Sequence, residues 1–303
     1  MNLASRMTLL LLLILSSAAF SAGDSRYQLQ VASGYHSNLF NSPSNNNALD
    51  SRFVSAHLGG QRHWQLKPNS ALQAELAFGV EQQLLDHELT DLSLSSGLYY
   101  LWQPKPGFTA AWYRLGLRTG YGWHPFAHYR QLNTNLSLAR NQRLTDKLSA
   151  RISGQLLGAW FEQPLLNRVQ AQLSSDLDWQ LAARSLLYVH GLLGYGDVHS
   201  AYSGLLQRSS TRSHHLPDED MSDQTIGVSD DYFLDTGISG ITGENWYQYR
   251  YRSGFGQVAV GWVQQLAQGI GLELNYRFSL QSNAEVSYQS HQAAISLVWQ
   301  PVR

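Results

Sequence analysis

The chain has no cysteine and few charged residues, and these shortages narrow what it can be. Without cysteine among its 303 residues, disulfides, thiolate metal sites and a lipid on an N-terminal cysteine are all excluded. Charged residues make up 14%, against about 25% in an average soluble domain. No later segment approaches the roughly 18 consecutive apolar residues of a membrane helix. The formal net charge of -1 gives no indication of nucleic-acid binding.

The N-terminus has the features of a secretory signal peptide. Arg6 gives a short positive region, Leu9–Leu15 form an unbroken apolar run, and small residues follow at Ser16–Ala19. This order predicts a signal peptide over residues 1–22 that is removed on export. The alternative is an uncleaved anchor, which the short apolar run disfavours. Residues 23–303 are then long enough for one large β domain.

Alternation of apolar and polar residues dominates the rest of the chain. In the segment 168–181, Val169, Leu173 and Leu177 share one face, and Gln170 and Gln172 lie on the other. A period of two is typical of β-strands with two different faces. The pattern predicts twelve strands, at about 26–35, 52–65, 70–83, 91–103, 108–121, 129–140, 146–160, 167–181, 185–196, 246–264, 269–281 and 286–299.

The connections between these segments alternate in length. Those after the even-numbered segments are short, at 66–69, 104–107, 141–145, 182–184 and 265–268. The two long ones, 36–51 and about 197–245, both follow odd-numbered segments. Transmembrane barrels have short periplasmic turns and longer outer loops. We therefore predict an all-β fold, a monomeric antiparallel up-and-down barrel of about 12 strands in a bacterial outer membrane.

Other β folds and other strand numbers remain alternatives. A soluble sandwich has strands of about 5–6 residues, roughly half the length expected here. A β-solenoid needs a fixed-length repeat, and none is evident. If the long loop contains a hairpin, at Tyr232–Ile241 or Leu205–Arg208, the count becomes ten or fourteen.

Aromatic residues close many of the segments. Rings of this kind form girdles at the two membrane interfaces of a barrel. The periplasmic girdle is expected to contain Trp64, Trp102, Trp179, Trp262 and Trp299. The outer girdle is expected to contain Tyr121, Trp160 and Tyr195.

Two segments resemble known outer-membrane barrels. Gly34–Pro43, with His36-Ser37-Asn38-Leu39-Phe40, resembles the Asp-Ser-Asn-x-Phe first loop of proteobacterial barrels linked to exopolysaccharide or surface-polysaccharide systems, with His36 in place of the Asp. Ala293, Ile295, Leu297 and Trp299 resemble the C-terminal signal read by the barrel-assembly machinery, although residues 300–303 extend past its usual terminal aromatic. The resemblance implies a barrel in contact with outer-membrane lipid and lipopolysaccharide, with a polysaccharide or polar solute as possible partner.

The alternation of inward and outward residues along each strand places charged side chains of both signs in the lumen. The inward set comprises Arg114, Arg118, Arg151, Arg168 and Arg277, with Glu75, Glu81, Asp91, Asp176, Asp178 and Glu273, and His57, His63 and His190. Five basic and six acidic side chains nearly cancel, so no ladder of one sign is expected. The charges either fill the lumen with salt bridges or line a narrow water-filled path.

Three functions are compatible with such a barrel. The first is a narrow channel or export accessory for a polar solute or saccharide, with Arg114, Arg118 and Arg277 as hydrogen-bond donors. The second is a closed scaffold whose 197–245 loop contacts a partner or polysaccharide.

The third is a lipid hydrolase with Ser37 as nucleophile and His36, His124 or His128 as base. No G-x-S-x-G, H-E-x-x-H or phosphate-loop motif supports an enzyme. The acidic residues of the long loop do not match an EF-hand, so no metal or cofactor is expected.

Overall fold

Thirteen β-strands and no α-helix make up the described part of the chain. The computed structural model describes residues 24–37, 50–84, 90–124, 129–162, 164, 167–203, 232–239, 245–282 and 287–301. In these ranges no helix is long and apolar enough to cross a membrane. The strands are β1 (Asp24–His36), β2 (Ser51–Lys67), β3 (Ser70–Gln83), β4 (Thr90–Trp102), β5 (Trp112–His124), β6 (Tyr129–Arg143), β7 (Leu148–Phe161), β8 (Arg168–Ala182), β9 (Ser185–Ser203), β10 (Tyr232–Ser239), β11 (Asn245–Ala267), β12 (Ile270–Ser282) and β13 (Ser287–Trp299).

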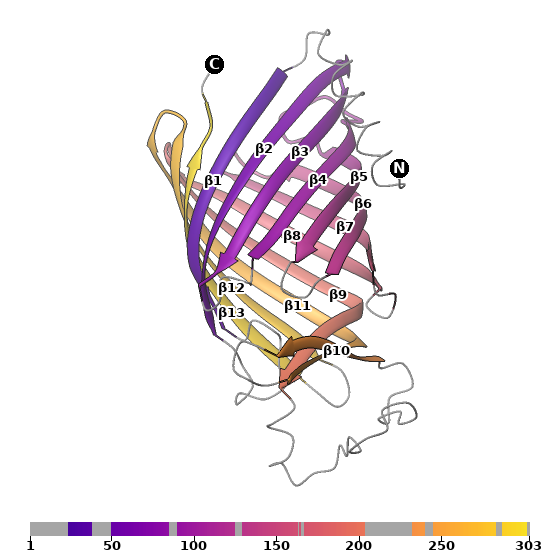
Figure 1. The fold of residues 1–303 in the computed structure, drawn as a ribbon. Coiled ribbons are helices and arrows are strands. Elements are labelled where there is room, and N and C mark those ends of the chain that lie inside the picture. Colours follow the sequence, from indigo (N-terminus) through magenta and orange to yellow (C-terminus); the bar gives the residue numbers. More distant parts are fainter. Residues whose placement is uncertain are drawn as a thin grey trace.

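The sheet closes into a barrel (Figure 1). Consecutive strands pair with each other except β9 and β10; β1 pairs with β13, and β9 pairs with β11. Only β10 lies outside the ring, so 12 of the 13 strands form a closed antiparallel barrel, as predicted. Closure leaves no strand edge in the ring unpaired, which a hydrocarbon environment requires because each unpaired backbone group costs several kcal/mol there.

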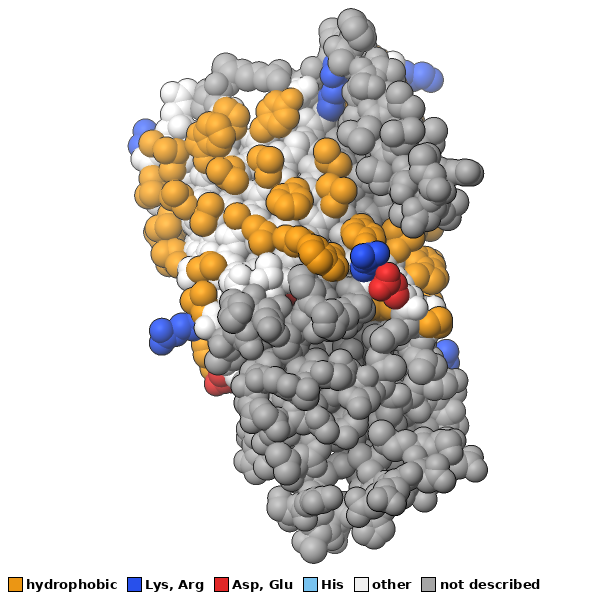
Figure 2. Space-filling view, viewed as in Figure 1, with side chains coloured by type: hydrophobic (Ala, Val, Ile, Leu, Met, Phe, Trp, Pro, Cys, Tyr) orange, Lys and Arg blue, Asp and Glu red, His pale blue; other side chains and the backbone are white. Residues whose placement is uncertain are grey.

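The two faces of the strands differ in chemistry as the alternation predicts. Leu173 is 57% exposed and Ile152 is 56% exposed on the outer face. Their neighbours Ser174 and Ser153 are buried on the inner face, where their hydroxyls lie 2.6 Å apart. Figure 2 shows hydrophobic side chains spread over the outside of the barrel, with few charged ones among them. The barrel thus has an apolar exterior and a polar interior.

The two ends of the barrel differ in their connections. One end carries the short turns, such as the one between β11 and β12, where Gly269 has a φ of 77° that favours glycine. We call it the turn end (Figure 1); β13 also ends there, where the N–H of Gln300 donates to the carbonyl of Gly269 at 2.7 Å. The other end, here the loop end, carries the connections after β1, β3, β5, β7, β9 and β12.

One strand begins later than predicted. The fifth strand was expected from residue 108, but β5 begins at Trp112. Gly107 has a φ of 139°, and the N–H of Ala110 donates to its carbonyl at 3.2 Å. This turn occupies residues that the alternation had assigned to the strand, so the connection after β4 runs from 103 to 111.

The long connection predicted at 197–245 is also shorter than expected. β9 continues to Ser203, which pairs with Trp246 of β11, so a two-stranded ladder extends beyond the barrel. β10 pairs with Asn245–Arg250 on the other edge of β11. Where a hairpin at Tyr232–Ile241 was the alternative, the structure has one strand, β10 at 232–239, which lies outside the ring and leaves the barrel at twelve strands. Leu205–Arg208 lies outside the described residues. So do most of the first loop (38–49) and the predicted signal peptide.

Glycines on the inner face lie opposite aromatic side chains of the neighbouring strand. Tyr99 pairs with Gly116 and Tyr188 with Gly261, and a Cβ at either glycine would lie 2.1 Å from the tyrosine ring. The rings therefore lie flat against the barrel wall, in space that only glycine leaves open. Covering a strand glycine with an aromatic ring also shields its backbone. The same cross-strand pairing joins Phe53 with Gly34, His57 with Gly79, and Phe255 with Gly194.

Candidate functional site

The register places all the predicted lumen charges on the inner face. Residues directly opposite one another in an antiparallel pair share a face of the sheet. Glu75 is opposite Gly97, which is opposite Arg118, and Arg151 is opposite Asp176. The same register places further charged residues on the inner face: Arg114, Arg168, Arg277, Glu81, Asp91, Asp178 and Glu273. The predicted girdle aromatics fall on the opposite, outer face, where Trp179, Trp299, Tyr121, Trp160 and Tyr195 are exposed.

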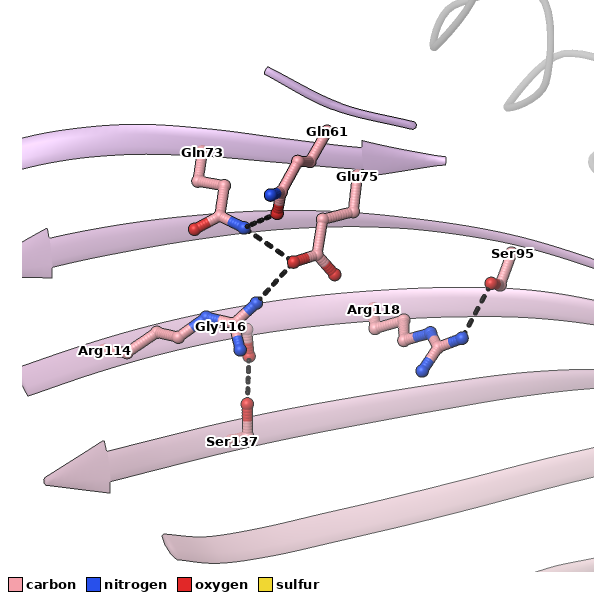
Figure 3. A network of polar contacts seen from close by, with 8 residues as sticks. All are labelled: Gln61, Gln73, Glu75, Ser95, Arg114, Gly116, Arg118 and Ser137. Carbon is pink, nitrogen blue, oxygen red and sulfur yellow. Dashed lines mark hydrogen bonds and ion pairs between the residues drawn. The ribbon is translucent and has the colours of Figure 1, made fainter. Parts of the chain in front are cut away.

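A cluster around Arg114 projects from the wall formed by β2 to β5. The guanidinium carbon of Arg114 lies 3.5 Å from the centroid of the Tyr99 ring. Its Nη2 donates to Oε1 of Glu75 at 2.8 Å, and Gln73 Nε2 donates to the same oxygen at 2.7 Å. Gln73 also donates to Gln61 at 3.0 Å. Figure 3 shows the hydrogen bonds that link Arg114, Glu75, Gln73 and Gln61. We call these four residues, together with Tyr99, the Arg114 cluster.

The Arg114 cluster depends on glycine at two positions. A Cβ at Gly97 would lie 2.7 Å from the Tyr99 ring, and one at Gly116 would lie 2.1 Å from it. Since β4 carries no side chain at Gly97, Arg114 of β5 reaches past it to Glu75 of β3. The cluster is thus a stacked layer of ring, guanidinium and carboxylate, and it lies nearer the turn end than the loop end.

A second set of charges lies on β7 to β9. Asp176 Oδ1 is 2.6 Å from Nδ1 of His190, and Arg151 is directly opposite Asp176 in the ladder. With Asp178 and Trp112, Arg151 and Asp176 line a cavity of about 470 Å³ near the turn end. The groups of opposite charge lie close together here, so neither sign dominates this part of the lumen.

A third set centres on Glu273 of β12. Its carboxylate accepts hydrogen bonds from the Tyr188 hydroxyl and, at 3.3 Å, from Gln30 Nε2. Asn275 Nδ2 donates to the same tyrosine hydroxyl. These contacts join β1 to β12 and β9 to β12. In the order of strands around the barrel, β9 and β12 lie on the side away from β3 to β5.

The side chains narrow the lumen without filling it. A cavity of about 390 Å³ lies between the middle and the loop end, lined by residues of β4 to β8. Another of about 570 Å³ lies at the turn end, where Gln61 and Glu75 meet Gln300 and Pro301. Gln300 Nε2 donates to Gln28 at 3.2 Å, so the residues after β13 reach the inner wall. The polar clusters therefore alternate with open space.

The predicted hydrolase residues do not form a catalytic pair in the described structure. The hydroxyl of Ser37 accepts a hydrogen bond from the backbone N–H of His291 at 2.8 Å. Nδ1 of His36 is buried and has no hydrogen-bond partner among the described residues. His128 lies outside them, as does the side chain of His124. Within the described ranges no three His, Asp or Glu side chains are placed to hold a metal ion.

Several lumen residues were missed because the sequence argument followed charge. Tyr99, Tyr188, Gln30 and Asn275 are neutral, yet they hold the charged groups in place. Arg26, a charged residue, was missed as well; it is inward, opposite Gln61 of β2. An inward aromatic beside an inward glycine on the next strand is the signal that would have found the two tyrosines.

An apolar exterior, a closed ladder and a polar lumen define a transmembrane β-barrel of the kind found in bacterial outer membranes. No protein-family model and no curated protein sequence matches this chain. Among solved structures, the chain is similar to the NanC porin, with a TM-score of 0.50 and 10% identity over 89% of this chain and 98% of the porin. It is similar to an outer membrane channel from Pseudomonas putida F1, with a TM-score of 0.50 and 12% identity over 93% of this chain and 98% of the channel. At such identities the likeness shows the fold alone.

Proposed function

We propose that this chain is a narrow channel of the bacterial outer membrane that admits small polar solutes. Its exterior is apolar, and its interior carries hydrogen-bonding groups of both signs. Two solved structures that are similar to it are a porin and a channel. With its short turns, the turn end faces the periplasm in this proposal, and the loop end faces outward.

The observation that carries the proposal is the Arg114 cluster with open space on either side of it. The cluster holds Arg114 against Tyr99 and Glu75, while cavities of about 570 Å³ and 390 Å³ lie in the turn-end part and toward the loop end. A plug would fill both spaces with side chains. We infer that the cluster forms a constriction between these two spaces, which is the arrangement of a selective pore.

Further assignments complete the proposal. Residues 1–22 are the cleaved signal peptide, and β13 carries the signal for the barrel-assembly machinery. The barrel is a monomer in contact with membrane lipid and lipopolysaccharide through its apolar band and the girdles. The likeness of Gly34–Pro43 to polysaccharide-associated barrels supports a saccharide as the solute. Lumen Arg, Gln, Asn and Tyr side chains would supply its hydrogen bonds.

Liposome swelling tests the channel directly. The refolded barrel is placed in liposomes, which are then diluted into isotonic arabinose or raffinose. We expect swelling in arabinose and much slower swelling in raffinose, because the constriction admits only small solutes. Liposomes without protein give the baseline. Swelling no faster than this baseline, from protein shown to be folded, would overturn the proposal.

The extension of β9 and β11 beyond the barrel favours a second candidate function, that of a closed scaffold. β9 and β11 pair as far as Ser203 and Trp246, and β10 is added to the edge of β11. This extension gives the loop end a surface that a closed scaffold could present to a partner or polysaccharide. Deleting residues 204–244 should then abolish binding of the partner and leave arabinose entry unchanged.

A further inference from the structure

A recess in the inner wall lies between the middle of the barrel and its loop end. It is the cavity of about 390 Å³, formed by β4 to β8. The recess is open because Gly120, Gly122 and Ala159 contribute no bulky side chain. Its polar surface comes from amides and hydroxyls, among them Asn133, Asn135 and Ser95. No residue of the Arg114 cluster lines the recess.

Arg118 in this recess differs from Arg114, although both lie on the inner face of β5. Arg114 is held by Glu75 and by the ring of Tyr99. Arg118 is exposed, and its Nη2 donates to the Ser95 hydroxyl at 2.8 Å. Figure 3 shows the two guanidinium groups turned toward different parts of the wall. Arg118 thus has N–H donors available to a solute, whereas Arg114 is held by Glu75 and Tyr99 of the wall.

The amides beside Arg118 add to the polar lining of the recess. Nδ2 of Asn135 donates to Gln155 at 2.7 Å. Its Oδ1 is buried and has no partner among the described residues. A buried acceptor without a partner costs about 1–3 kcal/mol. The hydrogen bond from Nδ2 to Gln155 holds the Asn135 amide at the lining of the recess.

We propose that the recess is a binding subsite for a small hydroxyl-rich anion, with Arg118 as the residue that contacts its negative group. Two guanidinium groups, Arg118 and Arg168, and one carboxylate, Asp91, line the recess and leave an excess of one positive charge. A guanidinium recognises a carboxylate or phosphate through two parallel hydrogen bonds. The amides and serines recognise hydroxyls. The inference rests on the proposed channel for its role in transport, but the binding itself does not require conductance.

Saturation-transfer NMR on the refolded barrel in detergent micelles tests the subsite without a membrane current. The probes are gluconate, sorbitol, glucosamine and glucose 6-phosphate. We expect gluconate to bind at least tenfold more tightly than sorbitol, which has similar hydroxyls and no charge, and more tightly than cationic glucosamine. Glucose 6-phosphate distinguishes a phosphate from a carboxylate as the preferred group. Equal binding of gluconate and sorbitol, or tighter binding of glucosamine, would overturn the proposal.

Variants assign the effect to Arg118. Arg118→Gln should weaken gluconate binding about tenfold or more, and Arg118→Lys should weaken it less, because a lysine keeps the charge but loses the paired geometry. The matched control is Arg140→Gln, since Arg140 lies on the outer face of β6 and donates to Gln142. It removes the same charge outside the lumen and should change nothing. An equal loss in both variants would show a nonspecific charge effect and reject the subsite.

A steric variant gives an independent test. A Cβ at Gly120 would meet its nearest atoms at 3.5 and 3.6 Å, which is ordinary contact. Gly120→Val should therefore fold and should weaken gluconate binding by occupying the recess. If gluconate binds Gly120→Val as well as the unaltered chain, the subsite is misplaced. Failure of the unaltered chain to admit arabinose, with its gluconate binding intact, would instead reject the channel and keep the subsite.

Discussion

Arg114 lies over the face of Tyr99, with its guanidinium carbon 3.5 Å from the ring centroid. The ring in turn covers Gly116, its direct partner on β5, and Gly97 on its own strand. Cation–π contacts contribute about 0.5–2 kcal/mol, and more when water is excluded. The pair also fixes how far the arginine projects from the wall. The width of the lumen at this level therefore depends on two glycines that touch no solute.

Gly116→Ala should destabilise the barrel by displacing the Tyr99 ring. The new Cβ would lie 2.1 Å from the ring, and overpacking of this kind costs about 1–3 kcal/mol. The free energy of unfolding in urea, measured in detergent or lipid, provides the check. Gly120→Ala is the matched control, because its Cβ makes ordinary contacts at 3.5 Å and beyond. Equal destabilisation by both changes would contradict the close contact of Tyr99 with Gly116.

Glu75→Gln should make the lumen prefer anions. The change removes the carboxylate that pairs with Arg114 at 2.8 Å and leaves the guanidinium charge in place. The reversal potential across a KCl gradient should move toward the chloride equilibrium potential. Glu162→Gln serves as control, because its 3.5 Å pair with Arg130 is more exposed, and such surface pairs contribute about 0–1 kcal/mol. A reversal potential that Glu75→Gln leaves unchanged would remove the Arg114 cluster from the ion path.

The barrel could be predicted from the sequence because its signals repeat. The period of two in segments such as 168–181 and the alternation of short and long connections both follow from a strand crossing a bilayer. The start of β5 could not be predicted, because the turn after Gly107 depends on a local hydrogen bond from Ala110 rather than on hydrophobic pattern. The extension of β9 to Ser203 was missed for a similar reason, since Asp197–Ser203 pair with β11 beyond the apolar band.

The candidate site was predictable in part. The alternation along each strand predicted that Arg114, Arg118 and Glu75 point inward. It did not predict their different roles. Those roles depend on which neighbours lie across the ladder: Glu75 two strands from Arg114, and Ser95 beside Arg118. Such partners are set by the register of several strands at once. A single strand's pattern contains no information about them.

A charge on the outer face of β8 should cost far more than the same charge on its inner face. Leu173 is 57% exposed on the outer face, and its neighbour Gln172 faces the lumen, where it donates to Gln170 at 3.1 Å. Arginine at the bilayer midplane costs about 2–4 kcal/mol in a barrel. Leu173→Arg should therefore lower the free energy of unfolding in lipid by about that amount. Gln172→Arg should change it much less, and a reversed order would contradict the assignment of the two faces.

Single-channel conductance in a planar lipid bilayer tests the central claim, that the lumen is an open path narrowed by the Arg114 cluster. The refolded protein should give discrete current steps of reproducible size. Arg114→Ala should give larger steps, whereas Arg140→Ala, on the outer face, should leave them unchanged. A silent bilayer from folded protein, or steps of the same size after Arg114→Ala, would contradict the account.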